Sequence, residues 1–264
     1  MITYRQLATT FSRLDLDPNR PVIAHASLST LGQIAGGSET VLGAILGNSS
    51  GLMMPTFTYK TMVTPEVGPA NNGIVYGSNE DLNAMAQFFS AEMPADPLMG
   101  RGAESLRLHP RAARSSHPIL SFAGINVQQA LQAQTLENPL GPIEVIAAAG
   151  GSVLLIGVDH TANTSLHLAE KEAGRKQFVR WALTQRGVVE CPGFPGSSEG
   201  FQQAASYLDE ISKQAFIGNA RLLALPLRPM LDIIRDLIAA DPFALLPEDS
   251  EDLRVQDTRM AALA

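Results

Sequence analysis

A histidine and a glutamate three positions apart are the residues of this sequence best suited to proton transfer. His167 and Glu170 follow the segment GVDHTANTSL and lie within a predicted helix over 163–174. Side chains three positions apart on a helix share a face. A neutral imidazole can accept a proton from an attacking amine near neutral pH. A carboxylate beside it would fix its tautomer and stabilise the imidazolium that forms. The pair predicts a general base with its partner, and the same spacing also fits an ordinary surface ion pair.

A metal ion bound by the same segment is an alternative. Asp159, His160 and His167 could hold an ion for metal-assisted hydrolysis. The second histidine of an H-E-x-x-H motif is missing, however, and a histidine three positions before a glutamate is a weak metal motif. We therefore expect no metal cofactor.

Two short segments could bind an anion through backbone N–H groups. Small and hydroxylated residues follow His25 at positions 27–30, and the residues GGS at 36–38 open a predicted helix. Small residues let amide groups approach an anion closely, and the first turn of a helix offers free amides. Neither segment has the GK[ST] ending of a P-loop, so a nucleoside triphosphate is not predicted. His25 itself is interpreted as a core histidine with a satisfied hydrogen bond.

Arginines are concentrated in one part of the chain. Four of them fall within 14 positions and surround the polar run RSSHP at 114–118, namely Arg101, Arg107, Arg111 and Arg114. Such a group suits an anion. Arginines along a solvated helix face would give the same spacing.

Two candidate nucleophiles are weaker. Residues 196–200 (GSSEG) fit the G-x-S-x-G motif of α/β-hydrolases. Prolines at 192 and 195 argue against the strand that must precede this motif, and no histidine follows His167. Cys191 lies in the apolar run GVVEC, where a small thiol is interpreted as packing. No covalent enzyme intermediate is therefore expected.

Elements of an α/β fold must position these residues. Three continuous apolar runs predict buried strands over 21–26, 51–55 and 152–158. Helices are predicted over 3–14, 38–47, 163–174, 201–213 and 230–240. Residues 60–100 have poor periodicity and predict a long loop or lid, with one helix over 81–89. We expect a single domain over 1–264, a mixed sheet flanked by helices.

Composition excludes several classes of protein. The 264 residues are 45% hydrophobic and carry a net charge of −7, so a nucleic-acid partner is not expected. The most apolar stretch, 145–158, is shorter than the roughly 20 residues of a membrane span. With no secretory signal in MITYRQLATTFSRL, we expect a cytoplasmic protein without membrane association. From position 190 onward the sequence has 12 acidic and 6 basic residues, and this excess fits a solvated tail or a surface that binds cations.

Four segments together resemble the aminoglycoside 3-N-acetyltransferase family, whose fold is unrelated to that of the common GNAT acetyltransferases. They are HASLSTLG (25–32) followed by the glycines at 36–37, LMMPTFTY (52–59), RSSHPILSFAG (114–124) and LLIGVDHTANTSLHLAE (154–170). Their order and spacing are those of the family, and the last two are specific. The resemblance implies an α/β fold and direct transfer of an acetyl group from acetyl-CoA to an amine in a ternary complex.

The resemblance also implies roles for individual residues. The family's general base, the histidine of the TSxHxxE segment, falls on His167, and its partner on Glu170. The family's CoA contacts fall on Ser27, Leu28, Ser29, Arg114 and Ser116, with Thr30 and Gly37 as weaker matches. Residues of matching segments expected to line the acceptor pocket are Tyr59, Asn163 and Asp159. The amide-rich loops and arginines suit a pyrophosphate, and the acidic remainder suits a polycationic amine.

The resemblance supports acetyl-CoA better than it supports a particular acceptor. It implies that residues 60–100 are the loop or lid at the acceptor site, and these residues do not look like the corresponding stretch of the well-known resistance enzymes. The expected acceptor is the 3-amino group of a 2-deoxystreptamine ring. Acylation of a different small amine is an alternative, and so is a CoA- or amine-binding protein without turnover. The protein is expected to be a monomer or a homodimer.

Overall fold

A seven-stranded mixed sheet forms the centre of the structure. The computed structural model describes residues 1–77 and 80–263, and its main sheet has the strand order β4-β5-β2-β1-β6-β10-β9. β1 (Pro21–Ala26) lies parallel to both its neighbours, β2 (Gly51–Pro55) and β6 (Ser152–Ile156). The other pairs are antiparallel and involve β4 (Ala113–Arg114), β5 (Phe122–Ile125), β9 (Lys213–Ile217) and β10 (Ala220–Pro226). The predicted α/β class with a mixed sheet is confirmed.

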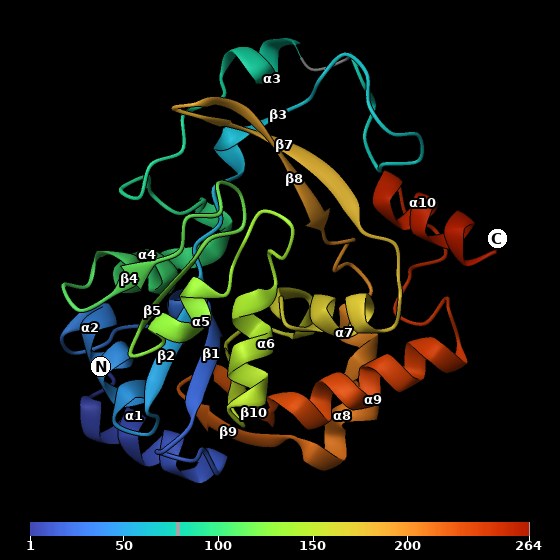
Figure 1. Cartoon of the computed structure of the whole chain (residues 1–264). Coiled ribbons are helices and arrows are strands. Elements are labelled where there is room, and N and C mark those ends of the chain that lie inside the picture. Colours follow the sequence, from blue (N-terminus) through green and yellow to red (C-terminus); the bar gives the residue numbers. More distant parts are fainter. Residues whose placement is uncertain (78–79, 264) are drawn as a thin grey trace.

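Helices cover both faces of this sheet (Figure 1). One face packs against α1 (Tyr4–Phe11), α2 (Gly37–Leu46) and α4 (Gly100–Leu108). The other packs against α5 (Gln128–Gln132), α6 (Gly141–Ala148), α7 (Leu166–Glu172), α8 (Ala205–Leu208) and α9 (Leu227–Ala240). Because both faces are buried, the central strands are continuous apolar runs, and this is why they could be recognised from sequence.

A second, smaller sheet lies above the main one (Figure 1). It has the order β3-β7-β8 and consists of β3 (Met62–Val63), β7 (Phe178–Thr184) and β8 (Gly187–Phe194). β8 is an edge strand and contains Pro192 near its end. The expectation that prolines exclude a strand here was wrong, because an edge strand tolerates a residue that cannot donate a ladder hydrogen bond.

Residues 60–100 are less irregular than predicted. Apart from positions 78 and 79, which lie outside the described residues, they contain β3, the helix α3 (Glu80–Ala84) and a 3₁₀ helix, Pro97–Met99. The predicted helix over 81–89 ends early: Met85 and Phe88 are exposed, so its apolar positions have no surface to pack against. Phe89 instead forms a β-bridge with Thr184 of β7.

The helix predicted over 201–213 is broken. It consists of two 3₁₀ segments, Phe201–Ala204 and Asp209–Ile211, on either side of α8, and Lys213 already belongs to β9. The hairpin of β9 and β10 turns at Gly218, whose φ is +58°. Pairing with β10 competes with helix here, and only the tertiary structure shows it. At the end of the chain α10 (Leu253–Ala262) lies beside the loop of residues 64–77 (Figure 1).

No helix in the described parts of the chain is long and apolar enough to cross a membrane.

Candidate active site

A cavity of about 490 Å³ opens where β1, β2 and β6 end. Parallel strands bring their carboxyl ends to one edge of a sheet, where ligands of α/β proteins collect. The walls come from the ends of β1 and β2, from Val158 and the residues after it, from Leu98 and Met99, and from residues 194–199 after β8. Asp252 and Arg254, at the start of α10, complete the lining. His167 faces this cavity from the opening turn of α7.

The predicted pair forms. Nδ1 of His167 lies 2.7 Å from Oε2 of Glu170, and both residues are buried. Since a carboxylate accepts, Nδ1 carries the proton and donates it, and Nε2 keeps the lone pair. The ring of Phe201 lies 4.7 Å from the imidazole, centroid to centroid, and restricts its orientation. His167 thereby keeps an unprotonated Nε2, which is the arrangement that a general base requires.

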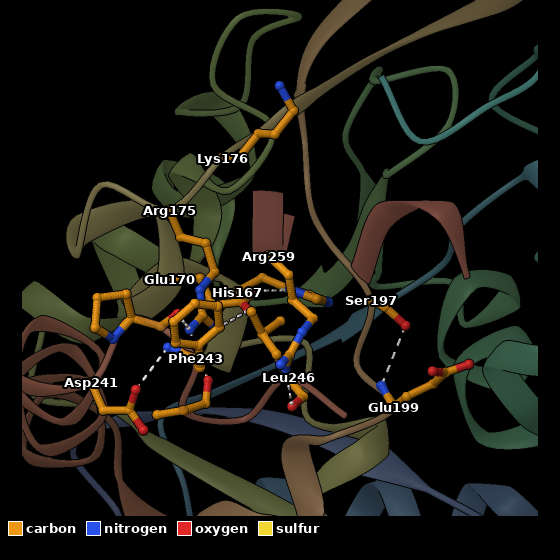
Figure 2. Close-up of polar contacts among 12 residues, drawn as sticks. His167, Glu170, Arg175, Lys176, Ser197, Glu199, Asp241, Phe243, Leu246 and Arg259 are labelled. Carbon is orange, nitrogen blue, oxygen red and sulfur yellow. Dashed lines mark hydrogen bonds and ion pairs between the residues drawn. The ribbon is translucent and has the colours of Figure 1, made fainter. Parts of the chain in front are cut away.

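Arg175 completes the arrangement and was not predicted (Figure 2). Its Nη1 donates to Oε1 of Glu170 over 2.8 Å, and its Nη2 donates to the carbonyls of Pro242 and Ala244. With a side chain only 4% exposed, it compensates the charge of the buried Glu170. The sequence held one indication of this contact, since Gly174 is a glycine at the end of the predicted helix and Arg175 follows it. In the structure Gly174 has a φ of +77° and turns the chain so that the N–H of Arg175 donates to the carbonyl of Glu170.

The segment predicted to bind CoA is a 3₁₀ helix, Leu28–Leu31, directly after β1. The hydroxyls of Ser27 and Ser29 lie 3.0 Å apart, and the Thr30 hydroxyl donates to the carbonyl of Ser27. Thr30 lines a second cavity of about 570 Å³, which adjoins the first because both are lined by Val158, Thr161 and Ala162.

Ser27, Leu28 and Ser29 line neither cavity, and the other predicted CoA contacts lie elsewhere. Gly37 begins α2 and lines neither cavity. The guanidinium of Arg114 donates to the carbonyls of Thr56, Ala91 and Met93 and to the Ser121 hydroxyl. These bonds use most of its donors to fasten residues 91–93 to the sheet. Ser116 is exposed and lines neither cavity. The structure does not bring Gly37, Arg114 or Ser116 to His167.

The predicted acceptor residues separate in the same way. Tyr59 lines the main cavity, and burial raises its pKa to about 12, so its hydroxyl is a neutral hydrogen-bonding group. Asp159 lines the second cavity and its carboxylate accepts from the Thr161 N–H. Asn163 is fully buried in the turn before α7, where its side-chain oxygen accepts from the Ser165 N–H, and it lines neither cavity.

The alternatives based on other residues are not assembled. Within residues 1–77 and 80–263 no three His, Cys, Asp or Glu side chains are grouped to hold a metal ion, the set of Asp159, His160 and His167 included. Burial raises the pKa of Cys191 to about 12, which leaves its thiol protonated and unreactive.

Sequence reasoning missed several residues of the cavity. Residues 196–199 belong to the G-x-S-x-G segment set aside above, and they form part of the cavity wall. Ser197 and Glu199 lie together there (Figure 2), and the Glu199 carboxylate accepts from the Ser250 hydroxyl over 2.6 Å. Arg254 donates to Asp252 and to the carbonyl of Gly196. The acidic end of the chain is therefore not simply a solvated tail; part of it packs on the cavity.

His25 is placed where a core residue was expected, but without the expected hydrogen bond. It is 5% exposed and lines the cavity, and none of the described residues bonds its ring nitrogens. Burial lowers its pKa to about 3, so the ring is neutral at physiological pH.

Comparison with known proteins gives a consistent result. Residues 23–239 match the family model described as aminoglycoside 3-N-acetyltransferase. An aminoglycoside N(3)-acetyltransferase VII of Streptomyces paromomycinus is 32% identical over 197 residues, which cover 67% of this chain and 64% of that relative. The match thus spans less than two thirds of the relative's length.

Solved structures share the fold. A histidine-to-alanine variant of aminoglycoside acetyltransferase AAC(3)-IVa, in complex with a gentamicin, has a TM-score of 0.78 at 23% identity and covers 98% of this chain and 97% of its own. AAC-IIIb, in a binary complex with CoASH, has a TM-score of 0.73 at 19% identity and covers 90% of this chain and 96% of its own. On the extent of the family match, this chain belongs to the aminoglycoside 3-N-acetyltransferase family.

Proposed function

We propose that this protein is an acetyl-CoA-dependent N-acetyltransferase that acts on the 3-amino group of a 2-deoxystreptamine aminoglycoside. The observation that carries the proposal is the buried row of Arg175, Glu170 and His167, which ends at the cavity. A protein that only binds its ligands has no need of a histidine oriented in this way. Membership of the family and the relatives that bind CoASH or gentamicin support the choice of substrates.

His167 acts as general base in direct transfer. The amine nitrogen bonds to the thioester carbonyl carbon while its proton passes to Nε2 of His167. The carbon–sulfur bond then breaks, and the proton passes from Nε2 to the leaving thiolate, which yields CoA and the amide. Glu170 stabilises the imidazolium between these two transfers, as the carboxylate of a catalytic triad does. Arg175 holds Glu170 in place.

The charge of the cavity wall suits a cationic acceptor. Glu199 and Asp252 line it. Asp252 is paired with Arg254, whereas among the described residues the Glu199 carboxylate has only a hydroxyl partner. Glu199 is therefore the carboxylate available to an ammonium group of the acceptor. Tyr59, which lines the same cavity, can donate or accept a hydrogen bond to a sugar hydroxyl.

The turn after β1 suits acetyl-CoA. The first turn of α4 has no side-chain cap and lies beside it, since a Cβ on Gly102 would come within 3.6 Å of Leu28. The first turn of a helix offers backbone amides that fit the phosphates of CoA. Ser27 to Thr30 remain the proposed contacts of CoA. Arg114 holds residues 91–93 in place, and residues 60–100 form the wall that distinguishes acceptors.

The test is release of thiol from acetyl-CoA with and without a panel of 2-deoxystreptamine aminoglycosides. We expect release that depends on the aminoglycoside and a mass gain of one acetyl group at one amine. His167→Ala should lower kcat by about 10²–10⁴-fold, the usual contribution of a general base. His109→Ala, which removes a histidine that lines neither cavity, is the control.

Three outcomes would contradict parts of the proposal. Acetyl-CoA binding without aminoglycoside-dependent release would move the acceptor to a different small amine. Unchanged kcat in a folded His167→Ala variant would remove the general base. Failure to bind acetyl-CoA would overturn the proposal as a whole.

A further inference from the structure

His25 is oriented toward the side of the sheet that carries His167. It is the fifth residue of β1 and pairs with Leu155 of β6. Side chains alternate along a strand, so His25 lies on the same face as Ile23. Ile23 and Leu155 belong to the apolar cluster that includes Phe201, whose ring contacts His167. Both histidines line the same cavity.

The His25 ring has no hydrogen bond to any of the described residues. Its Nε2 is fully buried and has no partner among them. Nδ1 makes no hydrogen bond to them either, and it is the ring nitrogen left for the cavity that His25 lines. Buried polar groups are nearly always hydrogen-bonded, and an exception in a folded protein calls for an explanation. Because the ring also lines the cavity, a bound molecule can partner the nitrogen that is not closed off, Nδ1.

The position of the proton follows from this burial. With its pKa lowered to about 3, the ring is neutral and carries a single N–H. A sealed N–H without an acceptor is rarer in proteins than a sealed acceptor without a donor. The proton therefore resides on Nδ1, and the sealed Nε2 keeps the lone pair. His25 thus offers the cavity a neutral donor, which does not compete with His167 for the proton of the amine.

We propose that His25 is a second catalytic residue, which donates a hydrogen bond from Nδ1 to the carbonyl oxygen of the acetyl thioester. This inference rests on the proposed function. As the amine bonds to the carbonyl carbon, the π electron pair of the C=O bond moves onto this oxygen. It returns when the carbon–sulfur bond breaks. A donor fixed in a buried site stabilises that charge without having to reorganise.

Two variants whose side chains branch in the same way separate this role from packing. His25→Asn places an amide N–H where Nδ1 stands, and His25→Leu places a methyl group there. We expect kcat to fall about 10²–10³-fold in His25→Leu, the usual loss of one oxyanion donor, and less than about tenfold in His25→Asn. The KM for acetyl-CoA should change little in either. The pH profile of kcat should keep its shape, since His25 does not titrate in the working range.

Thermal stability gives a readout independent of turnover. Replacing a buried polar group that has no partner by an apolar one is neutral or stabilising. His25→Leu should therefore unfold at the same temperature as wild type or higher, despite its lower activity. A Tm that falls together with kcat in His25→Leu, and to the same extent in His25→Asn, would show a structural role and overturn the assignment.

The hydrogen bond itself can be observed without any acceptor. Acetyl-CoA labelled with ¹³C at the carbonyl is bound to each variant, and the carbonyl stretch is measured by isotope-edited infrared difference spectroscopy. We expect a lower frequency than in free acetyl-CoA for wild type and His25→Asn, and none of this shift for His25→Leu. An unshifted band in wild type, or the full shift in His25→Leu, overturns the His25 assignment alone. Absence of acetyl-CoA binding overturns the proposed function with it.

Discussion

At the scale of single residues, the site contains buried charges that are paired, together with the His25 ring, whose Nε2 has no partner among the described residues. Glu170 is bonded by both His167 and Arg175, so its charge is compensated although it is 1% exposed. Removal of one partner of a buried ion pair leaves an uncompensated charge, which is far more costly than the loss of an exposed pair.

We therefore expect Arg175→Met to destabilise the fold by about 3–5 kcal/mol. The matched control is Arg228→Met. Arg228 also bridges two carboxylates, those of Glu172 and Asp232, but its side chain is 37% exposed, so the cost should be about 0–1 kcal/mol. Urea unfolding of both variants measures the difference. Equal costs would mean that Arg175 does not neutralise a buried charge.

The histidines with lowered pKa predict how stability depends on pH. His25 has a pKa of about 3 in the folded protein and His117 one of about 4, whereas an unfolded histidine has about 6.5. Below pH 6.5 the unfolded chain binds protons that the folded chain does not, so stability falls as pH is lowered. Between pH 6.5 and 4.5, His25 accounts for about 2–3 kcal/mol of this loss, at about 1.4 kcal/mol per pH unit.

This contribution is measured by unfolding wild type and His25→Leu with urea at pH 7 and pH 4.5. The variant should lose less stability than wild type over this interval. Parallel losses would show that His25 becomes protonated in the folded protein.

At the scale of elements, the site is held by the contact between two loops that follow neighbouring strands. Gly157, directly after β6, has a φ of +63°, and a Cβ there would overlap the Thr30 hydroxyl of the turn after β1. The glycine thus allows the segment that leads to His167 to pack against the segment predicted to bind CoA.

Gly157→Ala should lower both stability and kcat/KM for acetyl-CoA, because the turn containing Thr30 must move. Gly174 is the control: its φ is +77°, but a Cβ there meets nothing within 4 Å. Gly174→Ala should cost only the left-handed backbone strain of about 1–2 kcal/mol and leave KM for acetyl-CoA unchanged. Circular dichroism melts and steady-state kinetics check both. Equal effects of the two substitutions would refute the coupling of the loops.

At the scale of the whole molecule, distant parts of the chain share the cavity. The main sheet supplies its floor, residues 194–199 after the small sheet supply one wall, and the start of α10 supplies another. α10 also contacts the loop of residues 64–77, since the Asp257 carboxylate accepts from the N–H of Gly73. Asp252 and Arg254 lie beyond the span of the family match, which ends at residue 239.

Glu199→Gln should raise KM for a polycationic acceptor about two- to fivefold, the effect of one exposed charge pair, with KM for acetyl-CoA unchanged. The affinity of the wild-type protein for the polycationic acceptor should weaken at high salt, because exposed charges are screened. Glu248→Gln removes an equal charge from a residue outside the main cavity lining and serves as control. If both substitutions raise KM equally, the effect is one of net charge and not of a defined contact.

The central strands, the helix with His167 and Glu170, and the family could all be predicted from the amino-acid sequence alone. Apolar runs and three-residue spacing are local patterns, and they predict the same strand or helix in any fold that buries the apolar residues. Local patterns could not show which residues meet across the cavity. These contacts join segments that are far apart in the sequence or that a glycine turns toward each other. They are Arg175 with Glu170, Gly157 with Thr30, and the end of the chain with residues 196–199.

The small sheet was missed for the same reason, since β7 and β8 are half exposed and depend on each other for pairing. The missing partner of His25 is likewise visible only in three dimensions, because whether a buried nitrogen is satisfied depends on everything that packs around it.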